Sequence, residues 1–497
     1  MQVFFTNLEN KIRKYKTRYK KDNLIIKIKI IFWILKQCFI LKKININIKK
    51  HTNSDTLFFT IKLGGGVGDI ILGMHYVQSL HKFCSCKAVF DIISDKNEEV
   101  LKSLTLGHSY VREVFYSKNI TLKKISQSDV FIDIVRFPKV IFFNETKVKK
   151  LSQKIFDLIK KYNEFNENYF YFSDSAIEPL RIIWSLNNGH VRKTQTDIFH
   201  FLGMNKKTRF LLKMSPEAYS IIDKYNLNQN HFITIQRGVD SAYKKKENVR
   251  LWPYEYYNEL LKMIKNKFPY IKIVQIGKKD PDNKLEYIDI NLQGKTSFEE
   301  LKVLLKQSVL HIDGENGMVH LNHALNGHSA VFFAQTSLEF LSYSENINMK
   351  SLKNCPHWCE WVTPDWQEKC IRGYKKPPCI YDLKPKYCFK KISCFLEKKL
   401  QQNFTLIETQ ENSSGKTILK KEDIKNYIPI FQENEELYAD ILNLPFEDNS
   451  LDMIVWNEEG KILLLENYIF KEAIRVLKLE GYFEFNGKRY KKVFKPA

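Results

Sequence analysis

The sequence predicts an α/β protein built from two domains that each contain a mainly parallel sheet. The first observation is a buried strand, Leu57–Leu63, that runs through a glycine-rich turn into an apolar helix over Ile70–Leu80. The second is a regular alternation of strand and helix patterns between residues 232 and 334. Such an alternation is typical of a parallel sheet with helices on both faces.

The first domain is predicted over residues 56–210, with further strands at Ala88–Ile93 and Val130–Val135. The turn after its first strand contains the glycines Gly65, Gly66 and Gly68. Glycines let a ligand approach the backbone, and the amino end of the following helix favours negative charge. The run matches neither G-x-G-x-x-G nor the phosphate loop ending in Gly-Lys-Ser/Thr. It therefore indicates a ligand-binding edge without specifying the ligand.

The second domain, predicted over residues 211–350, shows the clearer pattern. Strands are expected at Phe232–Gln236, Ile271–Ile276, Ile288–Leu292, Val309–Ile312 and Ala330–Ala334. Helices are expected at Tyr254–Lys267, Ser297–Gln307 and Met318–Leu325. Ser297 and Glu300 have the spacing of a capping box. Ligands bind at the carboxyl ends of parallel strands, where this chain has Gln236–Gly238, Gly277–Asp280 and Asp313–Gly317.

Composition and charge limit the classes of function. The chain has 497 residues, of which 44% are hydrophobic and 27% charged, so a wholly disordered protein is excluded. Its formal net charge is +23. Lysine runs such as Lys244–Lys246 indicate either a solvated surface or attraction to an anionic partner such as a membrane. No nucleic-acid-binding motif accompanies the charge, so nucleic acid is not expected as a partner.

Residues 1–55 are predicted to form a basic amphipathic segment. Within the apolar stretch from Leu24 to Leu41 and just beyond it, Lys29, Lys36 and Lys43 recur every seven residues, on one stripe of a helix. We expect this helix to lie in a membrane interface with its lysines near anionic headgroups. Packing on the protein's own core is the alternative. No run of about 18 apolar residues occurs, so a membrane-spanning helix is not expected.

Five segments occur in an informative order along the chain. They are Gly66–Leu72, Arg250–Pro253, Val274–Gly277, Asn291–Ser297 and Glu315–Leu321. Together they resemble glycosyltransferase family 9, the heptosyltransferase family of lipopolysaccharide synthesis. The resemblance implies the GT-B fold, in which two Rossmann-like domains face a cleft. It also implies an inverting transferase that takes a sugar, with heptose favoured, from a nucleotide diphosphate donor such as ADP-heptose, and that needs no cofactor for transfer.

The same resemblance assigns roles to single residues. Asp69 matches the family's proposed base, which would deprotonate the acceptor hydroxyl; an aspartate at a helix start is also a good cap, and this alternative stays open. Arg250 lies where the family usually has a lysine that contacts the donor phosphate, and arginine can make that contact in bidentate form. Arg237 and Gly277, at neighbouring strand ends, are further candidate donor contacts.

One motif departs from the family pattern. The family usually shows Asp-Ser/Thr-Gly before its histidine, whereas this chain has Glu315, Asn316 and Gly317 before His320. Backbone amides at this helix start are still expected to hold the diphosphate. The altered side chains leave the donor sugar open. His320 either contacts phosphate or sugar, or is a structural histidine packed under the loop.

A cysteine-rich segment is predicted over residues 351–400 and contains six of the nine cysteines. Cytoplasmic thiols stay reduced, which favours a metal over disulfides. The more specific hypothesis is a zinc or iron ion held by Cys355, Cys359, Cys370 and Cys379. The alternative is that these cysteines are free structural thiols. The spacing is not a standard zinc signature. Some family members that glycosylate autotransporter proteins carry a cysteine-ligated iron in this region.

The last segment, residues 401–497, resembles part of another enzyme class. Ala439–Ile454 and Glu472–Tyr482 are similar to the second half of a class I S-adenosylmethionine-dependent methyltransferase. The Gly-x-Gly loop that would approach the cofactor is absent from residues 401–435. The segment is therefore expected to be a degenerate accessory module without methyl transfer.

The predicted function combines these points. We expect a cytoplasmic glycosyltransferase, peripheral on the inner membrane, that acts on a lipopolysaccharide, lipooligosaccharide or capsule acceptor. Two alternatives stay open. The cysteine cluster favours a protein O-heptosyltransferase, and the altered motif at Glu315 together with the incomplete methyltransferase module favours a non-catalytic, membrane-associated scaffold.

Overall fold

A computed structural model of the chain describes two compact units, Met1–Asn205 and Lys206–Ala497. The described residues are 54–94, 98–116, 128–134, 138–170, 210, 212–228, 231–237, 249–280, 284–336, 338–351, 355, 359, 366, 368–401, 404–408, 427–429, 444, 449, 451–456, 466–485 and 488–494. The predicted amphipathic segment and the lysine run at Lys244–Lys246 lie outside these residues.

The first unit contains a five-stranded sheet with the order β3-β2-β1-β4-β5. Strands β1 (Leu57–Leu63), β2 (Ala88–Ser94), β3 (Val111–Tyr116) and β4 (Val130–Ile134) are parallel, and β5 (Pro138–Phe143) is antiparallel to β4. The strand order reverses between β1 and β4. Ligands of open α/β sheets bind outside the carboxyl ends of the strands at such a switch point.

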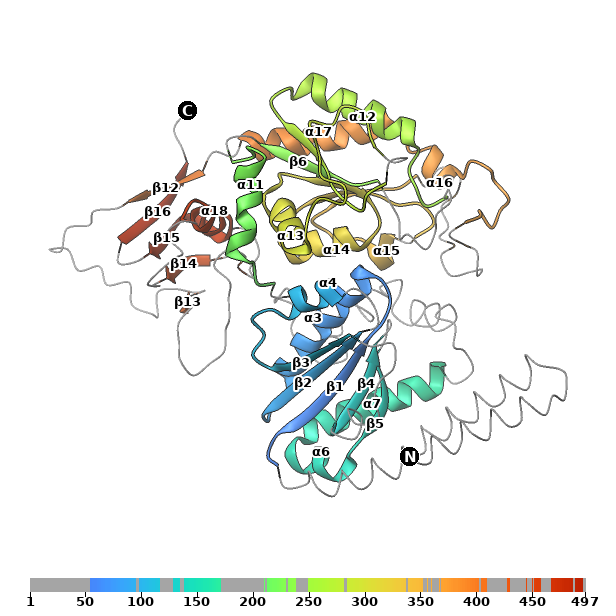
Figure 1. Ribbon diagram of the computed structural model, residues 1–497, viewed down its shortest axis with the longest axis vertical. Helices are drawn as coiled ribbons and strands as arrows, with labels where there is room; N and C mark the ends of the chain where they lie inside the picture. Colours follow the sequence, from blue (N-terminus) through green and yellow to red (C-terminus); the bar gives the residue numbers. More distant parts are fainter. Residues whose placement is uncertain are drawn as a thin grey trace. The chain divides into compact units, whose positions relative to one another are not determined.

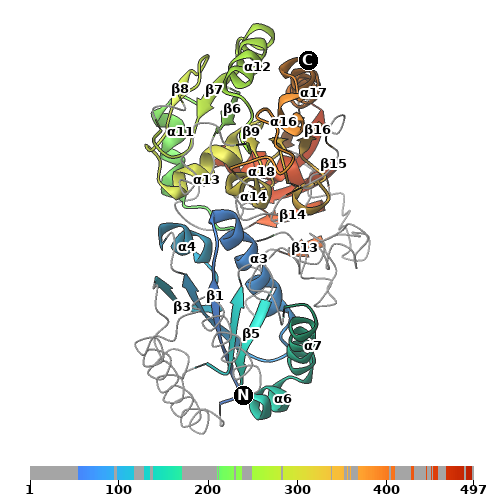
Figure 2. The same cartoon turned by 90° about the vertical axis from the view of Figure 1, so that its right-hand side faces the viewer.

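Helices cover this sheet because their apolar faces have no other partner. Helix α3 (Val67–Phe83) follows β1 directly, and α7 (Gln153–Phe170) packs beside it on the same face (Figure 2). The rings of Tyr76 in α3 and Tyr162 in α7 are both buried, with centroids 6.4 Å apart. The shorter helices of the unit are α4 (Glu98–Thr105) and α6 (Glu145–Leu151).

The second unit contains a six-stranded sheet with the order β11-β10-β9-β6-β7-β8. Its strands are β6 (Phe232–Ile235), β7 (Lys272–Gln275), β8 (Ile290–Asn291), β9 (His311–Gly314), β10 (Ser329–Phe332) and β11 (Ile347–Met349). All neighbouring pairs are parallel. If β6 is numbered as strand 1 and the sheet is followed from β8 to β11, the order is 3-2-1-4-5-6. This is the strand order of a doubly wound dinucleotide-binding sheet. The switch point lies between β6 and β9.

Helices flank this second sheet on both faces (Figure 1). Helices α12 (Tyr254–Lys267) and α17 (Pro385–Gln401) lie side by side on one face, and α13 (Phe298–Gln307) and α14 (Gly317–Ala324) cover the other. The shorter helices are η1 (Pro216–Tyr219), α11 (Ser220–Lys224), α15 (Leu338–Leu341) and α16 (Pro378–Tyr381). Ser297 caps α13 in the predicted capping box with Glu300, which is confirmed.

The core between α12, α17 and the sheet is centred on Trp252, which is fully buried. Its ring stacks on Phe332 with centroids 4.1 Å apart, and its Nε1 donates a hydrogen bond to the carbonyl of Leu383 at 2.8 Å. Cys388 of α17 belongs to the same core. Part of the cysteine-rich segment therefore completes the core of the second sheet.

A third sheet forms the C-terminal module, which we define as the described residues between 404 and 494. Its order is β12-β16-β15-β14-β13. The strands are β12 (Phe404–Glu408), β13 (Tyr427–Pro429), β14 (Leu451–Trp456), β15 (Leu477–Phe485) and β16 (Lys488–Phe494), with α18 (Glu466–Val476) before β15. The pairs β13–β14 and β14–β15 are parallel, and β16 is antiparallel to both β15 and β12.

The predicted α/β class with two Rossmann-like domains is confirmed. Most predicted strands and helices match observed elements within a few residues. The prediction that the two domains face a cleft and the five predicted domain ranges stay predictions. Within the described residues, no helix is long and apolar enough to cross a membrane.

Candidate functional site

The glycine turn of the first unit lies at the switch point of its sheet. The amide of Gly64 donates to the carbonyl of Ile134 at 3.0 Å, so the turn begins between the carboxyl ends of β1 and β4. Gly66 is the N-cap of α3, and its amide donates to Asp69 Oδ2 at 2.8 Å. Gly65 has φ +94°, and a Cβ on it would lie 2.2 Å from the same oxygen. Only glycine fits at position 65.

Asp69 therefore has the geometry of a helix cap, which is the alternative role predicted for this residue. It lies in the first turn of α3 and is partly exposed. At the same edge of the sheet, Lys62 Nζ and Asp133 Oδ2 form an ion pair at 2.7 Å. A cap and a catalytic base are compatible roles for one carboxylate. The role of Asp69 as a base stays a prediction.

In the second unit, the switch point brings the ends of β6 and β9 together. The amide of Gln236 donates to the carbonyl of Ile312 at 3.0 Å. Arg237 follows β6, and its Nε donates to the carbonyl of Trp252 at 3.4 Å. Its guanidinium lies 5.6 Å from the centre of the Tyr254 ring. Burial lowers the pKa of Arg237, which stays cationic at neutral pH because arginine starts from so high a value.

Arg250 reaches the same edge from a distant part of the sequence. Its Nη2 donates to the backbone carbonyl and to Oε2 of Glu315, each at 3.0 Å. Both side chains are largely buried, with 16% and 11% of their surfaces exposed. The guanidinium also lies 5.2 Å from the centre of the Trp366 ring. A fixed cation is thereby held at the amino end of α14.

The start of α14 is organised by two side chains that precede it. Asn316 is the N-cap, and its Oδ1 accepts from the amide of Met318 at 2.8 Å. Asp313 is fully buried and accepts from the amide of Gly314 at 2.7 Å. It also lies 3.2 Å from Nε2 of His311, which is buried too. Burial raises the pKa of Asp313. Asp313 therefore supports the loop from inside.

His320 lies one turn into α14 and is buried, with 6% of its surface exposed. Its Nδ1 is 2.8 Å from the hydroxyl of Tyr343, and its Nε2 is 3.9 Å from Oε1 of Glu315. His323 stacks on the same tyrosine ring at 3.6 Å. Glu315 thus lies between Arg250 and His320. Neither Tyr343 nor Trp366 could be predicted as part of the site from the sequence, because neither lies in a recognisable motif.

Gly277 lies at the end of β7, next to β6. It has φ +116°, and a Cβ on it would lie 3.2 Å from Oε1 of Gln236. Its carbonyl accepts from the amide of Gly294 at 2.7 Å. The predicted donor-binding residues of the second unit therefore gather at the carboxyl ends of β6, β7 and β9.

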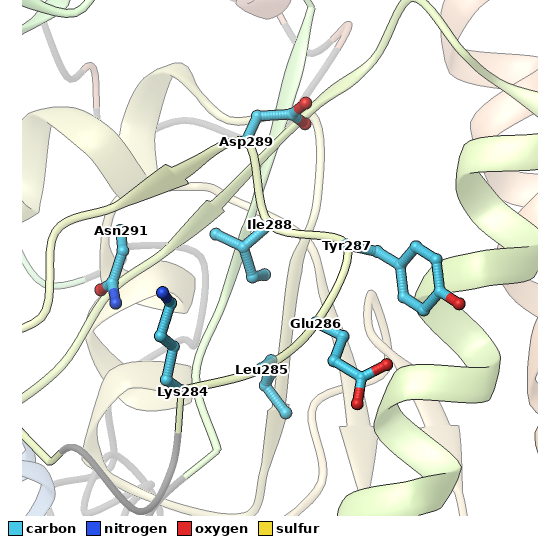
Figure 3. Close-up of a pocket in the computed structure, with 7 residues that line it drawn as sticks. All are labelled: Lys284, Leu285, Glu286, Tyr287, Ile288, Asp289 and Asn291. Atoms are coloured by element: carbon cyan, nitrogen blue, oxygen red, sulfur yellow. The ribbon is translucent and has the colours of Figure 1, made fainter.

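The cavity drawn in Figure 3 is a separate feature. It has a volume of about 480 Å³ and is lined by Lys284, Leu285, Glu286, Tyr287, Ile288, Asp289 and Asn291. The first six belong to the segment that leads into the edge strand β8, and Asn291 lies in that strand. None of the predicted site residues lines it, and we assign it no part in the site.

The cysteines of the predicted metal site are electrostatic neighbours. Burial raises the pKa of Cys379 to about 12; Lys350 opposes this shift, and Cys355, Cys359 and Cys370 add to it. Arg372 Nη1 donates to Cys355 Sγ at 3.9 Å. All eight cysteines in the described part of the chain are free thiols. Over those same residues, no three His, Cys, Asp or Glu side chains are placed to hold a metal ion.

The chain has a clear relationship to one family. Residues 184–370 match the family model described as Glycosyltransferase family 9 (heptosyltransferase). This part of the chain is therefore similar to family 9 glycosyltransferases. The matched range includes Arg237, Arg250, Gly277 and the segment from Glu315 to His320, but neither Asp69 nor Cys379. The activity class predicted from the sequence, a glycosyltransferase, is confirmed.

Several solved structures are similar to this glycosyltransferase chain. The ADP-heptose lipopolysaccharide heptosyltransferase II of E. coli shows 13% identity and a TM-score of 0.43, over 69% of this chain and 100% of that one. A family 9 glycosyltransferase from Veillonella parvula shows 12% identity and a TM-score of 0.45, over 69% and 98%. The iron-containing dodecameric glycosyltransferase TibC from enterotoxigenic E. coli shows 10% identity and a TM-score of 0.44, over 70% and 76%.

At these TM-scores the structural likenesses carry no argument about the substrate. A search of curated proteins finds no match to the chain.

Proposed function

We propose that the protein is an inverting, heptosyltransferase-like enzyme that transfers a sugar from a nucleotide diphosphate donor to a lipopolysaccharide, lipooligosaccharide or capsule acceptor. ADP-heptose is the favoured donor. The observation that carries the proposal is Arg250, a largely buried guanidinium held at the amino end of α14, at the switch point of a doubly wound sheet. Charge, backbone amides and sheet edge all favour an anionic ligand there.

The donor side of the reaction requires stabilisation of a leaving diphosphate. Arg250 and Arg237 supply positive charge, and the backbone amides at the start of α14, which begins at Gly317, supply hydrogen-bond donors. Glu315 neutralises Arg250 through their ion pair. We propose that an incoming diphosphate competes with Glu315 for this guanidinium. His320, held by Tyr343, would support the loop from below rather than contact the donor.

The acceptor side requires a base that removes the proton of a hydroxyl group. We propose Asp69 for this role, with its carboxylate fixed by the amide of Gly66. The proposed acceptor is a glycolipid or glycan, so the enzyme would be cytoplasmic and peripheral on the inner membrane. The charge of +23 supports a membrane surface as a partner. Absence of co-sedimentation with anionic lipid vesicles would contradict that location.

A nucleotide-binding test addresses the proposal directly. Purified protein is titrated with ADP, GDP, UDP, CMP and S-adenosylmethionine in thermal-shift and calorimetric experiments. We expect ADP to bind, and Arg250→Met to weaken its affinity about 10- to 100-fold, because a hydrogen bond to a charged group contributes about 1.5–3 kcal/mol. Binding of GDP or UDP instead would keep the transferase and change the donor.

Arg112→Met is the matched control. Arg112 donates to the buried Asp91 at 2.9 Å in the other unit, so this change also leaves a largely buried carboxylate unpaired. It should lower stability without weakening nucleotide binding. If wild-type protein binds none of the nucleotides, the scaffold is favoured over the transferase. Binding of S-adenosylmethionine would contradict our proposal that the C-terminal module is a degenerate, non-methylating methyltransferase-like domain.

We also propose that Cys355, Cys359, Cys370 and Cys379 hold a structural zinc or iron ion. The support is that Cys355, Cys359 and Cys370 each raise the pKa of Cys379. No three of these side chains are placed to hold a metal in the described residues, so a bound ion would have to draw the thiols together, and it would stabilise them as thiolates. This proposal favours protein O-heptosylation as the second candidate function, because the family resemblance of the sequence includes members that glycosylate autotransporter proteins and carry a cysteine-ligated iron in this region. Transfer to a peptide rather than to a glycolipid would decide for that candidate.

Metal analysis tests the cysteine site. We expect about one zinc or iron per chain in wild-type protein, and its loss in Cys379→Ser. Cys394→Ser is the control, because Cys394 lies in α17, is exposed, and does not contribute to the shift at Cys379. Wild-type protein purified without metal, or equal metal content in both variants, would refute the site.

A further inference from the structure

We infer that the C-terminal module holds the carboxyl end of α14 and thereby positions the amino end of that helix, with Glu472 as the central positioning residue. The module contacts the second unit's sheet domain through α18 and the segment at Leu444. The rings of Tyr468 in α18 and Tyr219 add an aromatic contact, with centroids 4.3 Å apart. Only the nucleotide-binding part of the test below rests on the proposed function.

Glu472 is the centre of a buried polar network. Its side chain is 3% exposed, and its Oε2 accepts from Lys306 Nζ of α13 at 2.6 Å. Its two oxygens also accept from Nε and Nη2 of Arg475 at 3.0 and 2.6 Å. Its Oε1 accepts from the amide of Leu444 at 2.8 Å. One carboxylate therefore joins the module to α13 and orders the segment at Leu444.

The network continues to the end of α14. Leu325 is the C-cap of that helix, and its carbonyl accepts from Lys306 Nζ at 3.2 Å. The next residue, Asn326, donates from Nδ2 to the carbonyl of Leu444 at 2.8 Å. The carbonyl of Leu444 also accepts from Nη2 of Arg475 at 2.8 Å. Asn326 is thus tied to the module directly, and Leu325 is tied to it through Lys306.

The charges in this network depend on one another. Lys306 is 7% exposed, so neither it nor Glu472 could remain ionised alone at this depth. Burial by itself raises the pKa of Glu472, but Arg475 and Lys306 outweigh it and hold the pKa below its usual value. Loss of the carboxylate would leave Lys306 buried without its partner and would weaken its hold on Leu325.

The other end of the same helix belongs to the proposed donor site. Helix α14 has 8 residues, so its ends are only about 12 Å apart. Asn316 caps the amino end, where Arg250 and Glu315 meet. A rigid element this short transmits a displacement of one end to the other. The sequence predicts that this module is a degenerate accessory domain. We infer that it nevertheless has a structural role in the proposed donor site.

The test compares Glu472→Gln with Glu484→Gln. Glu484 pairs with Arg489 at 3.3 Å within the β15–β16 hairpin, so its change alters the module without touching α14. We expect Glu472→Gln to speed amide hydrogen exchange in α14 by at least about tenfold, and Glu484→Gln to leave it within about twofold. The affinity for ADP should fall in Glu472→Gln but not in Glu484→Gln.

A second variant keeps the test decisive if Glu472→Gln does not fold. Asn326→Gly removes the tie to Leu444 but leaves the ion network intact, and glycine suits the φ of +60° at this position. It should change α14 exchange in the same direction. The inference would be overturned if these variants fold and melt at a lower temperature while amide hydrogen exchange in α14 is unchanged. If wild-type protein binds no nucleotide, the proposed function fails, while α14 exchange still decides the positioning role.

Discussion

Asp69→Asn is expected to lower the turnover of the transferase by about 10²- to 10⁴-fold, the range that a general base contributes. The asparagine side chain has nearly the same shape but cannot accept a proton at neutral pH. The affinity for the donor nucleotide should stay within about twofold, because Asp69 acts on the acceptor hydroxyl and not on the donor phosphates. Steady-state kinetics and nucleotide titration of the same preparation measure both quantities.

The capping role of Asp69 is separated from its catalytic role by the same variant. An asparagine oxygen can still accept from the amide of Gly66, so the free energy of unfolding should fall by no more than about 1 kcal/mol. Asp133→Asn is the control, since it removes a carboxylate at the same edge of the sheet that pairs with Lys62. If the activity of Asp69→Asn is within a few-fold of wild type, the role of Asp69 as a base is refuted and only its capping role remains.

Trp252→Ala is expected to give the largest loss of stability in the second unit, about 3–5 kcal/mol. The indole is fully buried between Phe332 and α12, where its ring lies 5.1 Å from that of Tyr257. Its removal leaves a cavity in the core and an unpaired carbonyl at Leu383. Urea denaturation followed by circular dichroism measures the change.

Trp252→Phe separates packing from hydrogen bonding. A phenyl ring keeps most of the stacking on Phe332 but cannot donate to Leu383, so a loss of about 1–3 kcal/mol is expected. The site should respond too, because the backbone of Trp252 accepts from Arg237 and Arg250 lies two residues before it. Equal stability of wild type and Trp252→Ala would contradict the central place of Trp252 in this core.

The sequence by itself determined the local elements and a resemblance to one family. The strand Leu57–Leu63, the helix Tyr254–Lys267 and the capping box at Ser297 were predicted within a residue of where the structure has them. These features depend on apolar periodicity and on cap residues, which act over a few positions of the chain. The predicted donor residues also lie at carboxyl strand ends, because a parallel sheet brings successive strand ends to one edge.

Only the tertiary structure decided which distant side chains pair. Arg250 and Glu315 are 65 residues apart, and Lys306 and Glu472 are 166 residues apart. No periodicity encodes such a contact, since it depends on strand order and on how helices pack across the sheet. The same holds for Tyr343 beneath His320 and for Cys388, which packs in the core around Trp252. The C-terminal module likewise gained a structural role only when folding brought Glu472 to the end of α14.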